Sequence, residues 1–329
     1  MISTVYKKKS LGQHFLHSKT YLNAVADAAD IQKSLPAGRQ GEVVLEIGPG
    51  EGALTEVLLE RGATVVAIEK DHRLIAPLRE RFSGQATTKK FVLIEGDALT
   101  LGGRGLLDKS LAQGSLPLVR RTEDPRGLLG SKSRPYKVVG NIPYYITGAL
   151  IRKYLTEKHQ PTTLVFLVQK EVAERITGHP STKLRVTKES ILSLSVKAYG
   201  TPVYVKTVPR GAFVPAPGVD SAILLVKNIS RDNFIARSTS FDLAQDKSLR
   251  ATSEVEAKFF ILVKAGFAQK RKMLKRNIEG VLGKHTLALM QKAGIAENAR
   301  AEDVALEQWL VLACPERFTL SPIEGSRRK

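Results

Sequence analysis

A chain of 329 residues in which 43% of the residues are hydrophobic is long enough for about two domains and can bury a substantial core. Its 51 basic and 32 acidic residues leave a net charge of +19, which predicts a polyanionic partner, most commonly a nucleic acid. The single cysteine, Cys314, excludes an internal disulfide and gives no support to a metal site, and the N-terminus lacks the apolar segment of a signal peptide, so we expect a soluble cytoplasmic protein without a membrane span.

The first strongly patterned unit follows a basic N-terminal run and a predicted amphipathic helix at residues 22–31. Residues 43–47 are an apolar run typical of a buried strand, residues 48–52 read G-P-G-E-G, and residues 53–61 have helical periodicity. A strand, a glycine turn and a helix form the opening of a nucleotide-binding β-α-β unit. The glycine spacing is not that of the dinucleotide fingerprint, and a tight turn without any ligand would explain it as well.

Carboxylates stand at the ends of the next two predicted strands. Glu69 follows the strand at 65–68, roughly 20 residues after Gly48, where a carboxylate can accept hydrogen bonds from ribose hydroxyls. Asp97 follows the strand at 91–94, where it can accept from an adenine amino group. Because ligands of open α/β sheets bind at the carboxyl ends of the strands, these residues predict one crevice for an adenosine-containing cofactor.

The sequence V-V-G-N-I-P-Y-Y at 138–145 predicts the end of a fourth strand and a stiff turn into the same crevice. The side-chain oxygen of Asn141 and a backbone carbonyl of the turn can converge on a planar exocyclic amine. Tyr144, next to Pro143, offers a flat face on which a base can stack. Taken alone, the stretch is equally compatible with an ordinary strand exit and a core tyrosine.

The rest of the first half alternates between strands and helices. Phe213 lies in a proline-stiffened loop at 213–221 and is either the second wall of a base pocket or a core residue that anchors the loop. The long segment at 99–135 predicts an irregular basic loop. The remaining predicted elements are helices at 149–154 and 170–176, strands at 164–168, 203–208 and 222–226, and strand material at 191–198.

Beyond residue 230 the chain changes character. Residues 231–254 are polar and predict a linker, and residues 256–282 predict one long helix, followed by shorter helices at 287–292 and 304–312. A cluster of cations with no acid among them predicts a surface that contacts phosphates. Its members are Lys270, Arg271, Lys272, Lys275 and Arg276.

Seven motifs follow one another in a fixed order along the chain. They are Q-H-F-L at 13–16, E-I-G-P-G-E-G-A-L-T at 46–55, Glu69, G-D-A-L at 96–99, N-I-P-Y-Y-I-T at 141–147, F-V-P-A-P-G-V-D-S-A at 213–222 and F-A-Q-K-R-K-M-L at 267–274. This ordered set resembles the rRNA adenine N6,N6-dimethyltransferase family, over most of the chain except residues 36–41, 100–135 and 231–254. The V-D-S-A sequence and the basic C-terminal helix make it most similar to the bacterial members that dimethylate two adjacent adenosines near the 3′ end of 16S rRNA.

This resemblance implies a Rossmann-like α/β domain of the class I S-adenosylmethionine-dependent methyltransferases over residues 1–229. A linker at 230–254 and a small all-α RNA-binding domain at 255–329 would follow. The target adenine would be oriented by Asn141, Pro143 and Tyr144, with Phe213 stacking on it. The partner would be 16S rRNA in a precursor of the small ribosomal subunit, and the protein a monomer with a role in ribosome biogenesis. The implied cofactor residues are His14, Leu16, Gly48, Gly50, Glu69, Asp97 and Asn141.

Three features depart from the family pattern. Gly218 replaces a usual lysine, residues 183–190 lack a common Tyr-Gly, and residues 100–135 are an insertion. The first two would weaken RNA contacts, and none removes a cofactor contact. The alternatives are an adenine methyltransferase acting on 23S rRNA, a DNA or protein methyltransferase, a ribosome-assembly factor with weak or no catalysis, and a dehydrogenase, which the glycine spacing disfavours.

Overall fold

The structure is a computed structural model of the chain, and it describes residues 14–31, 41–101, 107, 135–178, 188–235 and 245–315. The basic run at 7–13 and nearly all of the predicted insertion at 100–135 lie outside the described residues, as do the loop at 35–40 and residues 179–187. The chain divides into two compact units, which are residues 1–177 with 200–229, and residues 178–199 with 230–329. The first unit is therefore not one continuous stretch up to residue 229, because the segment 178–199 belongs to the second.

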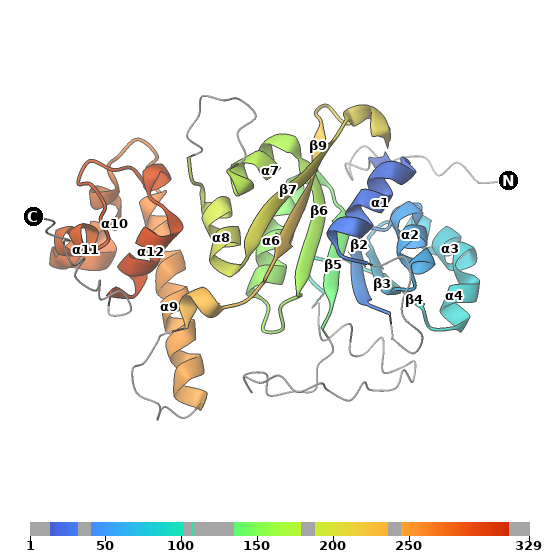
Figure 1. The fold of residues 1–329 in the computed structure, drawn as a ribbon, viewed down its shortest axis with the longest axis horizontal. Coiled ribbons are helices and arrows are strands. Elements are labelled where there is room, and N and C mark those ends of the chain that lie inside the picture. Colours follow the sequence, from blue (N-terminus) through green and yellow to red (C-terminus); the bar gives the residue numbers. More distant parts are fainter. Residues whose placement is uncertain are drawn as a thin grey trace, which may run out of the picture. The chain divides into compact units, whose positions relative to one another are not determined.

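The first unit is built on a seven-stranded sheet with the strand order β4-β3-β2-β5-β6-β9-β7 (Figure 1). The strands from β4 to β6 are parallel, whereas β9 runs antiparallel to both β6 and β7. The carboxyl ends of the parallel strands therefore meet at one edge of the sheet. The strands are β2 (Val43–Ile47), β3 (Thr64–Glu69), β4 (Phe91–Glu95), β5 (Lys137–Asn141), β6 (Thr163–Gln169), β7 (Thr201–Val208) and β9 (Ser221–Lys227).

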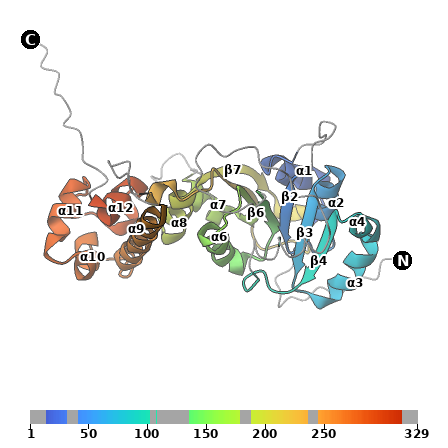
Figure 2. The same ribbon diagram turned by 90° about the horizontal axis from the view of Figure 1, so that it is seen from below.

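Helices cover both faces of this sheet, which explains why β2 and β3 are buried at every position. Helices α1 and α2 pack together on one face, and α6 lies on the opposite face (Figure 2). The predicted Rossmann-like α/β fold is confirmed. No helix among the described residues is long and apolar enough to span a membrane. The helices of this unit are α1 (Lys19–Ala28), α2 (Ala53–Glu60), α3 (His72–Arg81), α4 (Ser83–Thr87), α6 (Thr147–Thr156) and α7 (Lys170–Thr177), with 3-10 turns at Tyr144–Ile146 and Arg210–Ala212.

The prediction of strand material at 191–198 is wrong, because Ile191–Tyr199 is the helix α8 of the second unit. Its alternating leucines and serines mimic a half-exposed strand, but Ser193 and Ser195 are as buried as their apolar neighbours. The Ser195 hydroxyl donates to the Ile191 carbonyl at 2.6 Å, so the serines are satisfied within the helix itself. The sequence signal was the reciprocal cap at the start, where Ser190 and Ser193 exchange side-chain to backbone hydrogen bonds.

The prediction of one helix at 256–282 is also wrong. Helix α9 (Gln245–Gly266) ends at a glycine, and α10 (Leu274–Leu282) starts after a turn. The Asn277 side chain donates to the carbonyls of Gly266 and Gln269 at 2.6 and 3.2 Å, which holds the turn closed. A Cβ on Gly266 would lie 2.4 Å from the Trp309 ring, so the buried tryptophan requires a glycine there.

The remaining helices of the second unit follow the predictions more closely. The predicted linker at 231–254 is wrong in its last part, because α9 already begins at Gln245. It is also anchored near its start, where Phe234 is fully buried. The helices predicted at 287–292 and 304–312 are confirmed as α11 (Thr286–Lys292) and α12 (Leu306–Ala313).

Arg61, directly after α2, binds α1 and the residues that follow α1 through hydrogen bonds. Its Nη1 donates to Asp27 Oδ1 and the Ile31 carbonyl at 2.7 and 2.8 Å. Its Nη2 donates to Asn23 Oδ1 at 2.7 Å and to the Asn23 carbonyl at 3.3 Å. Because the Arg61 side chain is only 4% exposed, these bonds must replace its hydration. They fix the helix that immediately follows the N-terminal segment.

We predict that Arg61→Met lowers the free energy of unfolding by about 2–4 kcal/mol, because the variant leaves buried carbonyls without their charged donor. Urea denaturation followed by circular dichroism measures the change. The exposed residue Arg79 on α3 provides the control, and Arg79→Met should change stability by less than about 0.5 kcal/mol. Equal effects of the two substitutions would contradict the role given to Arg61.

Candidate active site

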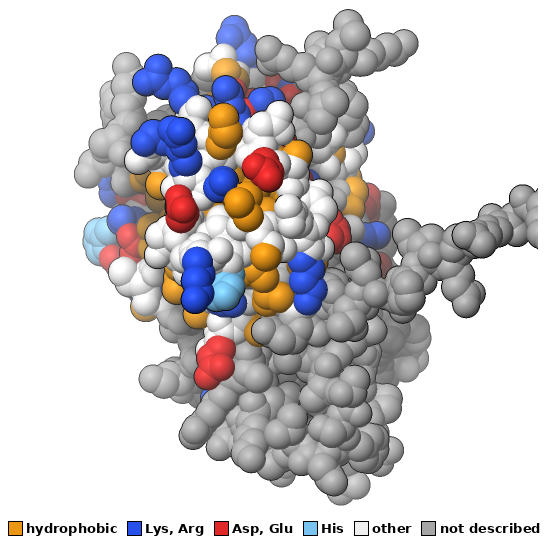
Figure 3. All heavy atoms as spheres, turned by 90° about the vertical axis from the view of Figure 1, so that its left-hand side faces the viewer, with side chains coloured by type: hydrophobic (Ala, Val, Ile, Leu, Met, Phe, Trp, Pro, Cys, Tyr) orange, Lys and Arg blue, Asp and Glu red, His pale blue; other side chains and the backbone are white. Residues whose placement is uncertain are grey.

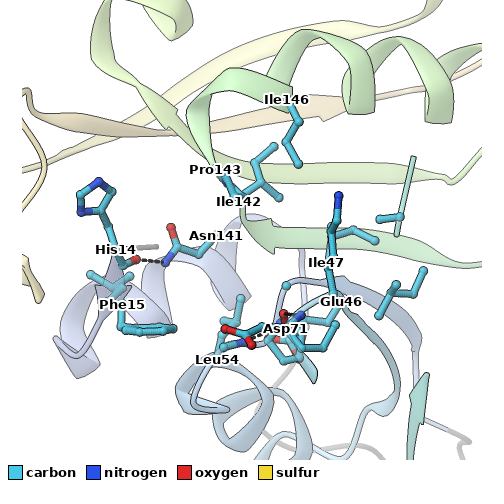
Figure 4. A pocket seen from close by; sticks show the side chains of 18 of the residues that line it. His14, Phe15, Glu46, Ile47, Leu54, Asp71, Asn141, Ile142, Pro143 and Ile146 are labelled. Carbon is cyan, nitrogen blue, oxygen red and sulfur yellow. Dashed lines mark hydrogen bonds between the residues drawn. The ribbon is translucent and has the colours of Figure 1, made fainter. Parts of the chain in front are cut away.

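A cavity of about 230 Å³ opens at the carboxyl ends of β2, β3 and β5, where the sheet predicts a ligand site (Figure 4). It is lined by the N-terminal segment, the glycine turn after β2, the end of β3, the loop after β4 and the turn after β5. In the described part of the chain, no cluster of three or more His, Cys, Asp or Glu side chains is placed to hold a metal. The predicted site residues that line the cavity are His14, Leu16, Gly48, Gly50, Glu69, Asp97, Asn141, Pro143 and Tyr144.

The turn after β2 needs its glycines for two different reasons. Gly48, Gly50 and Gly52 have φ angles of 64°, 60° and 85°, in the left-handed region that favours glycine. At Gly50 there is also a close contact, because a Cβ would lie 2.7 Å from the Phe15 ring. The space left by the missing side chain is thus used by the N-terminal segment, which closes over the turn.

Glu69 is fixed at the floor of the cavity by two backbone donors. Its Oε2 accepts from the Gly50 N–H at 3.1 Å, and its Oε1 accepts from the Asp71 N–H at 2.7 Å. Burial raises the pKa of this carboxyl group, and the two backbone bonds oppose that rise. Each oxygen keeps acceptor capacity, so the carboxylate can still receive hydroxyl donors from a ligand.

Glu46 is a buried cavity residue to which the sequence analysis gave no role. It is 1% exposed, lies on β2 two residues before Gly48, and accepts a 2.6 Å hydrogen bond from the Thr55 hydroxyl. Burial raises the pKa of Glu46 to about 8, with a further contribution from the nearby Glu69. The available signal was a glutamate inside an otherwise apolar run of the strand, V-V-L-E-I.

Asp97 lies in the loop after β4 and is held from two sides. Its Oδ1 accepts from the Leu99 N–H at 2.9 Å, and its Oδ2 accepts from Lys70 Nζ at 2.7 Å. The Lys70 ammonium is the main cause of the lowered pKa of Asp97. Behind this loop, Lys153 of α6 donates to the carbonyls of Leu99 and Leu101. The aspartate is therefore an ionised acceptor at the cavity edge.

Asn141, at the end of β5, has an amide group of fixed orientation. Its Nδ2 donates to the His14 carbonyl at 2.7 Å, and a carbonyl can only accept, so the amide nitrogen must face His14. The side-chain oxygen then points away from that carbonyl (Figure 4). The following turn is closed by a 3.2 Å hydrogen bond from the Ile146 N–H to the Pro143 carbonyl. The cavity thus contains one pre-oriented neutral acceptor.

Tyr144 is held at both its hydroxyl and its ring. The hydroxyl lies 2.7 Å from Ser221 Oγ on β9, so the serine of the V-D-S sequence holds the Tyr144 hydroxyl in place. The ring is stacked with the His14 imidazole, at 6.1 Å between centroids and 23° between planes. His14 Nδ1 in turn donates to the Pro215 carbonyl at 2.8 Å. Burial raises the pKa of Tyr144, so its hydroxyl stays neutral.

Phe213 does not line the cavity, so its position favours the alternative interpretation of a core residue that anchors the loop, and its stacking on the target base stays a prediction. It lies on β8 (Phe213–Val214), which pairs antiparallel with β1 (Phe15–Leu16), and Leu16 is its register partner. Phe213 and Leu16 are each 3% exposed and belong to the hydrophobic core. The strand pairing turns the ring inward, which the pattern of prolines alone does not reveal. Leu16 likewise can offer a ligand mainly its backbone.

The predicted cationic cluster lies in the second unit, and none of its members lines the cavity. Lys270, Arg271 and Lys272 occupy the turn between α9 and α10 and are exposed, and Lys275 and Arg276 follow on the first turn of α10. They therefore stand on a bent turn and not on one straight helix face. Figure 3 shows lysine and arginine side chains spread over one face of this unit, with hydrophobic side chains between them.

Comparison with known proteins places this site in context. Over residues 5–242 the sequence matches the family described as "Ribosomal RNA adenine dimethylase". A protein named "Ribosomal RNA small subunit methyltransferase A" from Dehalococcoides mccartyi strain CBDB1 is 37% identical over 309 residues, which cover 93% of this chain and 87% of the relative.

Two solved structures have a similar fold. A dimethyladenosine transferase from Plasmodium falciparum has a TM-score of 0.61 at 23% identity, covering 91% of this chain and 96% of that one. The 23S rRNA methyltransferase ErmE has a TM-score of 0.59 at 24% identity, covering 91% of this chain and 98% of that one. At these identities the likeness shows a shared fold and does not discriminate between substrates.

We predict that Glu46→Gln reduces the pH dependence of stability. The pKa of Glu46 is raised from 4.5 to about 8, so between these values the native state keeps a proton that the unfolded chain has lost. The free energy of unfolding therefore falls by an amount on the order of 4 kcal/mol as the pH rises through this window, and it is constant above the window.

Urea denaturation at about pH 6 and about pH 8.5 tests this expectation. The free energy of unfolding of the wild-type protein should be lower at the higher pH. For Glu46→Gln this decrease should be smaller by a few kcal/mol. Glu60→Gln, at an exposed position at the end of α2, should follow the wild type. Parallel curves for the wild type and Glu46→Gln would rule out a buried neutral Glu46.

Proposed function

The chain belongs to the ribosomal RNA adenine dimethylase family, and we propose that it dimethylates N6 of two adjacent adenosines near the 3′ end of the small-subunit (16S) rRNA. The observation that carries the proposal is the fixed amide of Asn141 in the same cavity as Glu69 and Asp97. This combination provides an acceptor for an amine next to acceptors for an adenosine. The name of the 37% identical relative supports the small subunit as the substrate.

The cofactor of this family of methyltransferases is S-adenosylmethionine, which supplies an electrophilic methyl group on sulfur. The residues of the cavity fit it. Glu69 offers acceptors for ribose hydroxyls, and the ionised Asp97 offers one for the adenine amino group. Gly48 and Gly50 line the cavity and have no side chains, so a ligand can approach the backbone of the turn closely. The ionised Asp97 at the cavity edge favours a ligand that carries positive charge.

Asn141 makes the target amine nucleophilic. The N6 lone pair of adenine is delocalised into the ring, so the free amine reacts poorly. A hydrogen bond from N6–H to the Asn141 oxygen, with a second to a carbonyl of the turn, draws the nitrogen toward tetrahedral geometry and localises its lone pair. The interaction strengthens as positive charge develops on nitrogen, so it stabilises the transition state more than the ground state.

Held by Glu69 and Asp97, S-adenosylmethionine would supply the methyl group to this nitrogen, and the electron pair of the broken methyl–sulfur bond would remain on sulfur. The methylated nitrogen then carries a positive charge and releases a proton, which requires no strong base. The first product keeps one N–H, which can again donate to Asn141, so the same acceptor serves the second transfer. Tyr144, whose ring orientation is fixed by Ser221 and His14, provides a face for the extruded base.

The proposed partner is 16S rRNA within a precursor of the small subunit, met by a cytoplasmic monomer during ribosome biogenesis. The cationic cluster at the α9–α10 turn supplies sequence-independent contacts to its phosphates. An assembly factor without catalysis is not favoured by the described residues of the site, because the proposed cofactor acceptors and Asn141 all line the cavity. The similarity to ErmE concerns the fold and gives no preference to 23S rRNA.

We predict that Asn141→Ala lowers kcat about 10²–10³-fold, because the amine loses its pre-oriented acceptor. Tritiated S-adenosylmethionine, purified protein and small subunits lacking the modification provide the assay, and N6,N6-dimethyladenosine is measured after digestion of the rRNA. Asn298→Ala, an exposed asparagine in the second unit, serves as the control and should retain full turnover. Full turnover by Asn141→Ala would exclude the mechanism. Absence of dimethyladenosine with the wild-type enzyme would exclude the substrate.

We also predict that Arg271→Ala and Lys272→Ala each weaken binding to the small subunit and lower the slope of log Kd against log[KCl] by about one. The reason is that each cation releases a counterion from the RNA when it contacts a phosphate. Arg79→Ala, an exposed arginine on α3, should leave the slope unchanged. An unaltered slope in the cluster variants would show that these cations do not contact phosphates.

A further inference from the structure

Tyr145 is an exposed aromatic side chain at the cavity. With 67% of its surface accessible, it is the most exposed large hydrophobic residue in the described part of the chain, and the only aromatic one among the exposed residues there. It also lines the cavity that holds Asn141 and Tyr144. Exposing a large apolar ring to water is unfavourable, and such rings at the mouth of a site commonly contact a partner.

The backbone that carries Tyr145 is fixed. On either side of it, Ile142 and Thr147 are 2% and 3% exposed, so the turn is anchored in the core at both ends. The Ile146 N–H closes the turn onto the Pro143 carbonyl at 3.2 Å. Because the backbone is already ordered, a ligand that covers the ring incurs little additional loss of conformational entropy.

Tyr144 and Tyr145 are neighbours in the chain but face different environments. Tyr144 is partly buried, with its hydroxyl bonded to the fully buried Ser221 and its ring against His14. Tyr145 turns toward solvent, and its ring pairs with no other aromatic ring among the residues that the structure describes. One tyrosine thus serves the interior of the cavity, and the other is available at its mouth.

We propose that Tyr145 stacks on the adenine adjacent to the one held in the cavity. The inference rests on the proposed function, in which the two target adenosines are neighbours. When one base is extruded, the neighbouring base loses a stacking partner and exposes a flat face. An aromatic ring at the mouth replaces that partner, and an adenine presents a large surface to it. Tyr145 would therefore fix the position of the strand while Asn141 activates the amine.

The test measures steady-state methylation of small subunits reconstituted with unmodified rRNA. Tyr145→Ala should raise the KM for the particle about tenfold and change kcat much less, with the Kd for S-adenosylmethionine unchanged. Tyr145→Phe, which keeps the ring, should restore the wild-type KM, and Tyr145→Leu, which is apolar but not flat, should not. Val205→Ala, at an exposed position on β7 outside the cavity lining, is the matched control.

A substitution in the RNA identifies the base that is contacted. Each of the two adenosines is replaced in turn by an abasic nucleotide, and methylation of the remaining one is measured. For at least one of these RNAs, kcat/KM of the wild-type enzyme should fall by about the same factor as it falls for Tyr145→Ala on intact RNA. For Tyr145→Ala itself, the abasic substitution should cause no further fall in kcat/KM. Such non-additivity is expected only when the ring and the missing base contact each other.

Three results would overturn the inference. They are a wild-type KM for Tyr145→Ala, additive losses with both abasic RNAs, or a weakened Kd for S-adenosylmethionine with an unchanged KM for the particle. The last would assign Tyr145 to the cofactor. Failure of the proposed function has a different signature, because the wild-type enzyme would then form no dimethyladenosine in any of the RNAs.

Discussion

The hydrogen bond from Asn141 to the carbonyl of His14 joins two parts of the chain that are 127 residues apart in sequence. It sets the direction of the Asn141 oxygen, and so the chemistry of the site depends on the position of the N-terminal segment. That segment is held by the pairing of β1 with β8, by the contact of Phe15 with Gly50, and by α1, which Arg61 ties to α2. Residues far from the cavity therefore determine the geometry of a single amide.

The site is assembled at a cost in stability. Glu46 and Glu69 are buried at the ends of neighbouring strands, and burial raises the pKa of both. Different hydrogen bonds offset the loss of hydration of the two carboxyl groups. Glu69 accepts from two backbone N–H groups, and Glu46 accepts from one hydroxyl. Such conflicts with the rule that core residues are apolar are expected at functional sites, where the surrounding core compensates for them.

Three aromatic residues around the cavity show how packing assigns roles. Phe213 is pulled into the core by a two-residue strand, Tyr144 is held half-buried by Ser221, and Tyr145 remains in solvent. All three lie in motifs shared with a family that binds bases, and nothing in their residue types separates them. Only the neighbours of each ring decide which can meet a ligand.

The sequence by itself determined the parallel strands of the first unit and most of the residues that line its cavity. Apolar runs that end in Gly48, Glu69, Asp97 and Asn141 are strong local signals, and parallel strands must bring their carboxyl ends to one edge. Other features depended on contacts between distant segments. The burial of Phe213, the burial of the serines in α8 and the break at Gly266 under Trp309 follow from neighbours far away in the chain. A local sequence pattern gives the periodicity of the apolar residues in a segment, and so its helix or strand type. The tertiary structure supplies the partner that covers each face, and that partner decided the burial of these residues.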